Sequence, residues 1–194
     1  MTSQELTQLI RSRRAVFPEM YLPQEISEQE IREILENASW APTHKKTEPW
    51  RFIVFQGSGR ADIADWITAR YTAHATQAGD FSETKREKFR HKVMSSGCVI
   101  GICMQPDPAH RLPEWEELAA VSCAVQNMWL TCTAMQIGCY WSSPAFVTGS
   151  EDMPGMQPEW QCLGLFYMGR WSGEVLPAKR APIEEKTIWI NTSK

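Results

Sequence analysis

The sequence predicts an α+β fold in which helices pack against a mixed β-sheet, within a single domain spanning residues 1–194. Helical and strand-like patterns alternate along the whole chain, and apolar runs that suit buried strands recur. No internal repeat or low-complexity segment interrupts this alternation. The length of 194 residues suffices for one domain that buries roughly two thirds of its unfolded surface.

The first half of the chain predicts three helices and one strand. Apolar residues at helical spacing precede the first arginines, and a second helix begins at Ser27 and Glu30, which form a capping box. Residues 52–55 predict a strand, and residues 61–71 predict the third helix. The polar segment 72–90 has few apolar anchors, so we expect either a mobile excursion or a surface helix there.

The second half predicts the centre of the sheet and a long helix. Residues 99–104 form an apolar run that suits a central strand. Residues 114–137 predict a long helix that Gly138 closes at its carboxyl end. Two more strands are expected at residues 139–141 and 163–168.

The long helix also predicts an assembly. Residues 119–137 place apolar side chains on nearly every face, whereas a surface helix has a polar stripe. One sheet covers one side, so we expect a second subunit to cover the other. Burial of three or four large side chains would contribute about 5–10 kcal/mol before association costs. The sequence therefore predicts an obligate homodimer, and residues 187–190 predict a strand without an obvious local partner.

Residues 118–150 contain no charged side chain, but they do not predict a membrane span. Gln126 and Gln136 lie within the segment, and Gly138 and Pro144 break it. Its flanks also lack the clustered lysine and arginine residues that border membrane helices. We expect a buried helix followed by a strand.

Composition and cysteine spacing narrow the class of protein further. The chain is 43% hydrophobic and 22% charged with a net charge of −3, which argues against a partner such as nucleic acid or an anionic membrane. None of the six cysteines forms a Cys-x-x-Cys pair, and the amino terminus lacks a signal-peptide pattern. We therefore expect buried, reduced thiols and a cytoplasmic location. The four histidines are widely scattered, so no metal site is predicted.

Three cationic segments, far apart in the sequence, are candidates for binding one anion. They are Arg11-Ser12-Arg13-Arg14, His44-Lys45-Lys46 and Lys179-Arg180, and prolines flank the second and third. The planar guanidinium of arginine binds phosphate through two parallel hydrogen bonds. The alternative for each segment is a solvated surface. Together they favour a shared site for the phosphate of a flavin.

Two further segments bear on this site. At Trp141-Ser142-Ser143 a strand ends after the long helix, and backbone donors there would face a ring system, unless the segment is a plain corner. Trp40 and Trp50 flank the second cationic segment and suit packing against a flat molecule. Residues 57–59 lack the third glycine of a dinucleotide-binding fingerprint, so we expect only a turn.

These motifs resemble the nitroreductase family of flavin enzymes, especially its short single-domain bacterial members, and the resemblance spans essentially the whole chain. The motifs that carry it are Ile10-x-x-Arg13-Arg14, Ala41-Pro42-Thr43-His44-Lys45 with Pro49-Trp50-Arg51-Phe52, the apolar helix before Gly138 and Trp141-Ser142, and the strand Gly164-Leu165-Phe166-Tyr167-Met168-Gly169 before a basic, proline-bounded segment.

The resemblance implies a three-layer α/β/α sandwich with a mixed, mostly antiparallel central sheet and a long central helix at a homodimer interface. It implies two tightly bound FMN molecules that both chains contact, transient binding of NADH or NADPH, and ping-pong hydride transfer to small electron-poor acceptors such as nitroaromatics and quinones. No side chain need act as an acid or base, since the flavin carries the chemistry. The implied cofactor-binding residues are Arg13, Arg14, Ala15, Trp40, Pro42, Thr43, His44, Trp141, Ser142, Ser143, Lys179 and Arg180.

By the same resemblance, these residues divide into three groups. Arg13 and Arg14 would hold the phosphate and ribityl side, joined by Lys179 or Arg180. Residues 42–44 would reach the flavin from the other subunit, and residues 141–143 would line the isoalloxazine ring.

The sequence also departs from the family pattern. Ala15 stands where serine is usual, and Phe17 stands where a basic residue is common. The positive charge beside the ring would then come from Lys92 or a backbone dipole. Two alternatives to a nitroreductase stay open: a flavin-dependent dehalogenase or flavin-fragmenting enzyme, and a flavin-binding homodimer without turnover.

Overall fold

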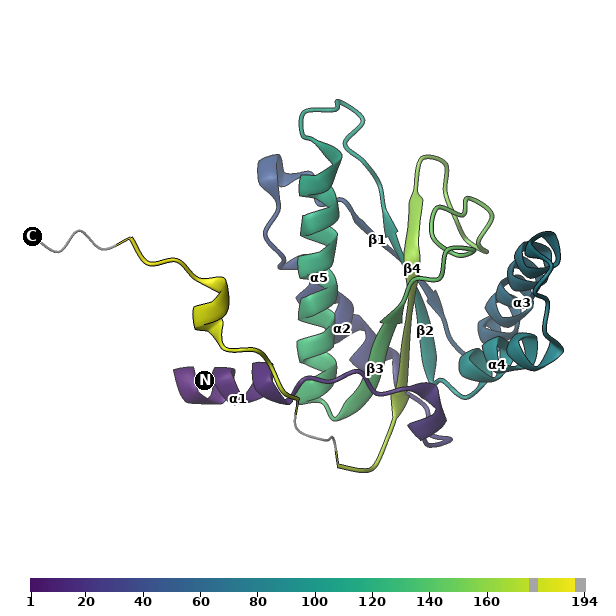
Figure 1. Cartoon of the computed structure of the whole chain (residues 1–194), viewed down its shortest axis with the longest axis horizontal. Coiled ribbons are helices and arrows are strands. Elements are labelled where there is room, and N and C mark those ends of the chain that lie inside the picture. Colours follow the sequence, from purple (N-terminus) through teal and green to yellow (C-terminus); the bar gives the residue numbers. More distant parts are fainter. Residues whose placement is uncertain (175–177, 191–194) are drawn as a thin grey trace, which may run out of the picture.

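A four-stranded antiparallel sheet forms the middle layer of the protein (Figure 1). The structure is a computed structural model that describes residues 1–174 and 178–190. The strands lie in the order β1-β2-β4-β3, with bounds Trp50–Phe55 for β1, Cys98–Met104 for β2, Ile137–Ser142 for β3 and Gln161–Arg170 for β4. The mostly antiparallel sheet is thus confirmed. The parallel pairing that a mixed sheet needs does not occur within the described residues.

Helices cover both faces of this sheet, which confirms the three layers (Figure 1). Helices α2 (Glu28–Ser39) and α5 (Glu114–Ala134) pack on one face, and α3 (Gly59–Ala78) and α4 (Glu83–Met94) pack on the other. Helix α1 (Ser3–Ser12) lies outside the layers, beside the carboxyl end of α5. The polar segment 72–90 therefore forms the end of α3 and most of α4, which confirms the surface-helix alternative.

Local sequence signals explain where several helices begin. The predicted capping box at Ser27 and Glu30 is present at the start of α2, and Thr2 with Glu5 forms another at the start of α1. Helix α5 begins after Pro113 with three glutamates in its first turn, where the helix dipole favours negative charge.

The end of the long helix differs from the prediction. Helix α5 ends at Ala134, and Gln136 adopts the left-handed backbone conformation with φ of 57°. Gly138 instead lies inside β3, where a side chain would come within 2.9 Å of both Trp171 and Val16. The predicted helix end at Gly138 is therefore wrong. Gly138 allows Trp171 and Val16 to pack closely against β3, and Gln136 adopts the left-handed conformation in the turn after the helix.

The hydrophobic core has two parts, one on each face of the sheet. Every residue of β2 is buried, as expected for the central apolar run. Five of the six cysteines are buried and all six are free, whereas Cys123 is exposed on α5. The uncharged segment 118–150 forms most of α5, all of β3 and the loop after it, as predicted. Among the described helices, none combines the length and the apolar character needed to cross a bilayer.

The described residues of one chain leave the outer face of α5 and the carboxyl-terminal segment uncovered. Leu118 is 42% exposed and Trp115 is 68% exposed. Residues 178–190 run past α1 and away from the sheet (Figure 1). Ile188, Trp189 and Ile190 are 91%, 77% and 88% exposed. The strand predicted at residues 187–190 is therefore wrong for the single chain, since that segment pairs with no strand among residues 1–174 and 178–190.

Candidate functional site

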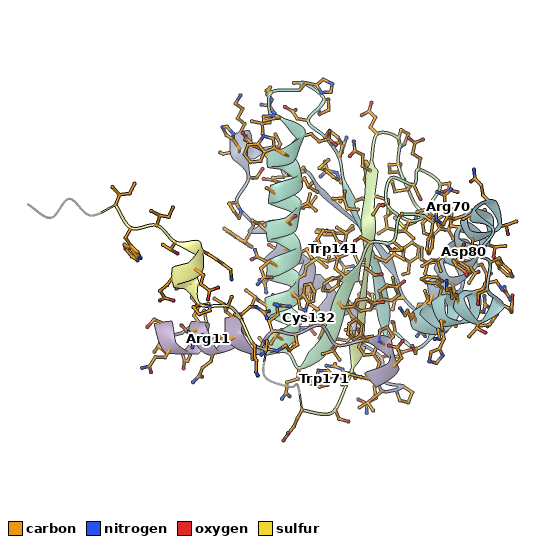
Figure 2. All side chains as sticks on the ribbon, viewed as in Figure 1. Arg11, Arg70, Asp80, Cys132, Trp141 and Trp171 are labelled. Carbon is orange, nitrogen blue, oxygen red and sulfur yellow. The ribbon has the colours of Figure 1, made fainter. Side chains whose placement is uncertain are left out.

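Two of the three predicted cationic segments come together at the carboxyl end of α5. Arg13 follows α1 directly, and its guanidinium carbon lies 4.7 Å from the centroid of the Trp129 ring on α5. Burial lowers the pKa of Arg13, and the positive charges of Arg14 and Arg180 lower it further. Arg180 is thus close enough to repel Arg13, although the two residues are far apart in the sequence. Figure 2 shows Arg11 and Trp171 at this same end of the molecule.

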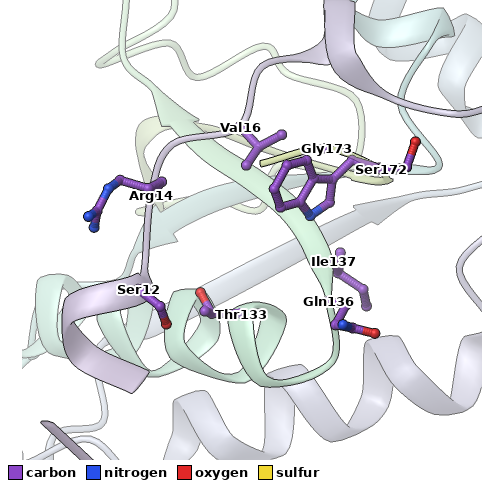
Figure 3. A pocket seen from close by; sticks show the side chains of 9 residues that line it. Ser12, Arg14, Val16, Thr133, Gln136, Ile137, Ser172 and Gly173 are labelled. Carbon is purple, nitrogen blue, oxygen red and sulfur yellow. The ribbon is translucent and has the colours of Figure 1, made fainter. Parts of the chain in front are cut away.

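Arg14 takes a different direction from Arg13. Its guanidinium donates to the backbone carbonyls of Arg11 at 2.6 Å and of Arg13 at 2.8 Å. It also lines a hollow of about 530 Å³ (Figure 3). The other lining residues are Ser12, Val16, Thr133, Gln136, Ile137, Trp171, Ser172 and Gly173. Arg13 is not among these residues, so the two arginines do not form one fork within this chain.

The free edge of β3 lies next to the cationic pair. Strand β3 pairs with β4 along one edge, and the N–H of Val16 donates to the carbonyl of Cys139 on the other edge at 3.0 Å. Alternate residues of an antiparallel strand direct their backbone groups to the same edge, so the N–H and carbonyl of Trp141 also face outward. Within the described part of the chain, neither these groups nor the buried indole Nε1 of Trp141 has a hydrogen-bond partner. The backbone N–H of Trp141 therefore offers a donor at this edge, whereas its indole Nε1 is buried against Gly164 of β4.

Side chains alternate between the two faces of β3. Trp141 packs with the core under α5, whereas Tyr140 packs with the core under α3 and α4. Ser142 follows Tyr140 by two residues and shares its face. Trp141 and Ser142 therefore cannot both touch one face of a flat ring through their side chains. Ser143 lies just beyond the strand.

The second cationic segment lies near the opposite end of α5. His44 Nδ1 is 2.6 Å from Glu116 Oε2, and Lys45 Nζ donates to the carbonyl of Arg111 at 3.0 Å. Glu116 and Trp129 are separated by roughly 20 Å along the helix, at about 1.5 Å per residue. Within one chain, the structure thus brings Arg13 and Arg180 together but leaves His44 apart.

This second segment has a strained backbone. Lys45, Lys46 and Glu48 have φ values of 51°, 56° and 45°, although none of them is glycine. Such conformations cost of order 1–3 kcal/mol each and concentrate at ligand-binding segments. Trp40, which precedes the segment, is 79% exposed, whereas Trp50 is buried and belongs to the core.

The structure places two residues near the predicted site that the motifs did not. Trp129 supports Arg13, but its sequence context indicates only an apolar helix. Lys92 Nζ lies 6.0 Å from the centroid of the Tyr140 ring, and the Phe17 ring lies 5.0 Å from the same ring. The sequence suggested Lys92 only as one alternative source of positive charge. Several other cations lie in the same helix, so its sequence context does not single it out.

Comparisons with known proteins agree in family and fold. The family model described as the nitroreductase family matches residues 10–170. YfhC of Bacillus subtilis strain 168, provisionally named an NAD(P)H nitroreductase, is 27% identical over 186 residues, which cover 93% of this chain and 92% of YfhC. A nitroreductase-like family protein from Bacillus cereus has a solved structure with a TM-score of 0.77, 25% identity and 98% coverage of both chains.

A second solved structure shows the fold at lower identity. It is a provisionally named nitroreductase from Desulfovibrio desulfuricans in complex with FMN. The TM-score is 0.73 and the identity 22%, with 99% of this chain and 100% of that chain covered. The three-layer arrangement is therefore shared over the full length of both chains.

Proposed function

The chain belongs to the nitroreductase family, and from that premise we propose that it is a cytoplasmic FMN-dependent oxidoreductase that oxidises NADH or NADPH. It passes the electrons to electron-poor acceptors such as nitroaromatics and quinones. The observation that carries the proposal is the proximity of Arg13 and Arg180 beside the free edge of β3. A flavin mononucleotide has a phosphate, which suits the two arginines, and a flat ring, which suits the free edge of β3.

The residues present fit the phosphate end of FMN. Arg13 and Arg180 repel each other in the free chain, and a phosphate between them would turn this repulsion into two charge-assisted contacts. The Trp129 ring beneath Arg13 holds its guanidinium in place, so little side-chain freedom is lost on binding. Lys179 adds a further charge next to Arg180.

The residues also fit the ring end. The outward N–H of Trp141 can donate to an acceptor atom of the ring at the free edge of β3. Ala15 offers no hydroxyl, so the backbone contributes the hydrogen bonds on this side. Bound FMN supplies hydride transfer. The chain orients the ring, excludes water from one side of it and provides positive charge.

We further propose that the site is completed by a second copy of the chain. The outer face of α5 carries uncharged residues, which include Trp115, Leu118, Ala119, Ser122, Cys123 and Gln126. Packing two α5 helices antiparallel about a twofold axis would bury this face. It would also bring the His44 end of one helix to the Arg13 end of the other. Trp40, Pro42, Thr43 and His44 would then reach the partner's FMN.

The carboxyl-terminal segment supports the same assembly. Ile188, Trp189 and Ile190 are exposed in one chain, and β1 is an edge strand whose outer side is unpaired within the described residues. Exposed strand edges are usually covered in stable proteins. We propose that residues 187–190 pack on the partner subunit, where they gain apolar contacts that they do not make with the described residues of their own chain.

The visible absorption spectrum of the freshly purified protein is the first test. We expect a flavin spectrum that persists through gel filtration, bleaches with NADH or NADPH under anaerobic conditions, and returns when a nitroaromatic or a quinone is added. A colourless protein that takes up no added FMN would contradict the proposal. A yellow protein that neither nicotinamide bleaches would favour a flavin-binding homodimer without turnover.

A further inference from the structure

Lys92 is a half-buried cation without a carboxylate partner in the described residues. The two half-buried arginines of α4 are paired, since Arg86 binds Glu83 and Glu87 and Arg90 binds Asp65, whereas Lys85 and Lys88, unpaired within the described part of the chain, are exposed. Lys92 Nζ lies instead 5.8 Å from the centroid of the Phe89 ring and 6.0 Å from that of Tyr140. Holding an ammonium away from water without a counter-ion is costly, so this arrangement favours a negative charge nearby.

The position of Lys92 relates it to the proposed flavin site. Tyr140 precedes Trp141 on β3, and Trp141 directs its backbone to the free edge of that strand. The ring of Phe17 lies 5.0 Å from the ring of Tyr140 and is 48% exposed. The charge of Glu19, in the neighbouring turn that contacts α4, also acts on Tyr140, but Glu19 and Lys92 form no ion pair. The ammonium therefore lies beside the strand that would support the ring.

We propose that Lys92 is the positive charge that stabilises the reduced flavin in this site and thereby raises its reduction potential. The inference rests on the function proposed above. When a hydride leaves NADH or NADPH, NAD(P)⁺ is formed, and the neutral flavin ring gains the hydride with its electron pair and one negative charge. A fixed ammonium beside the ring binds this anion more tightly than the neutral ring, and the difference in affinity sets the potential.

The test compares reduction potentials by anaerobic dye equilibration, together with the affinity of the apoprotein for oxidised FMN. Lys92→Met removes the charge but keeps an apolar stem over the two aromatic rings, and Lys92→Gln is a second neutral variant should the first fail to fold. We expect either to lose about tenfold in affinity for reduced relative to oxidised FMN, which is about 30 mV for a two-electron couple. Lys92→Arg should retain the wild-type potential.

Two further variants test whether the reduction potential depends on the position of the Lys92 charge or only on the net charge of the protein. Lys88→Gln removes one charge from an exposed position one turn before Lys92 on the same helix and should leave the potential unchanged. Phe17→Lys, added to Lys92→Met, returns a cation beside Tyr140 and should recover most of the loss. Wild-type potential in the neutral Lys92 variants, or an equal loss in Lys88→Gln, would overturn the inference. A wild-type protein that binds no FMN would instead overturn the proposed function.

Discussion

Arg13 is the residue on which binding of the phosphate depends most, because Trp129 fixes its guanidinium and Arg180 lies close to it. We expect Arg13→Ala to weaken FMN binding by about 1.5–3 kcal/mol, the usual contribution of a hydrogen bond to a charged group. This corresponds to a dissociation constant roughly ten- to a hundredfold higher, measured by quenching of FMN fluorescence. Arg11→Ala, an exposed change on the same segment, should have little effect. Equal retention by both variants would place the phosphate elsewhere.

Asp107 secures the loop between β2 and α5, and its stabilising effect should depend on pH. Its carboxylate accepts hydrogen bonds from the Arg111 side chain, with Nε at 2.7 Å, and from the backbone N–H groups of Ala109 and Arg111. The bond from the Arg111 side chain is the largest cause that lowers the pKa of Asp107 to about 2.

A carboxyl whose pKa falls on folding stabilises the folded state above its unfolded pKa of about 4, and the effect is lost as the pH falls towards 2. The difference in unfolding free energy between wild type and Asp107→Asn should therefore be constant above about pH 5 and shrink below pH 4. Urea unfolding at a series of pH values measures it. Asp80→Asn, an exposed change, should show no comparable trend. A difference that persists unchanged to low pH would contradict the assignment.

At the scale of single residues, the sequence indicated which residues belong to the candidate site better than it indicated where their side chains point. Arg13 and Arg180 were expected in one site, and the charge of Arg180 contributes to the lowered pKa of Arg13. Arg14 was expected beside Arg13, but it folds back onto α1. The direction of each side chain in this extended segment depends on how Val16 pairs with Cys139. This contact joins residues far apart in the chain, so the local sequence does not predict it.

Among the elements, the turn between α5 and β3 offers a direct test of backbone strain. Gln136 has φ of 57°. Glycine adopts this region without a steric penalty, so we expect Gln136→Gly to stabilise the protein by about 0.5–1 kcal/mol in urea unfolding. The same substitution at Gln77, inside α3 with an ordinary helical backbone, should destabilise it by about as much. If both changes destabilise the protein, the side chain of Gln136 stabilises the fold by more than its backbone strain destabilises it.

Elements specified by local contacts were predicted well, and those that depend on distant partners were not. The capping box at Ser27 lies within four residues, so its pattern alone indicates the start of α2. Residues 187–190 have strand-like composition, but a strand needs a partner, and the described part of the chain provides none. The end of α5 was misplaced because Gly138 meets Trp171, a contact between segments far apart in the sequence.

For the whole molecule, α5 sets the distance between the two halves of the proposed site. His44 binds Glu116 near its amino end, and Arg13 lies against Trp129 near its carboxyl end. One chain cannot bring these groups to a single FMN, because roughly 20 Å of helix separates them. The apolar residues around the helix predicted a second subunit, and the exposed face of α5 is consistent with that prediction. An antiparallel pair of chains would form two equivalent sites, each from opposite ends of the two helices.

This arrangement predicts complementation between two defective chains. Arg13→Ala removes the phosphate contact, and His44→Asp places a second carboxylate beside Glu116 and so should displace the strained segment. Each variant alone should form a homodimer with little bound FMN. In a heterodimer of the two, one site combines both defects, whereas the other has Arg13 from one chain and His44 from the partner.

Co-expression with two different affinity tags isolates this heterodimer, and its flavin absorbance relative to protein gives the occupancy. We expect half the FMN of the wild-type dimer and half its activity. If each site were built within one chain, every site in the heterodimer would still carry one defect, so occupancy would stay at the level of the homodimers. That result would refute the shared site while leaving flavin binding by the wild-type protein intact.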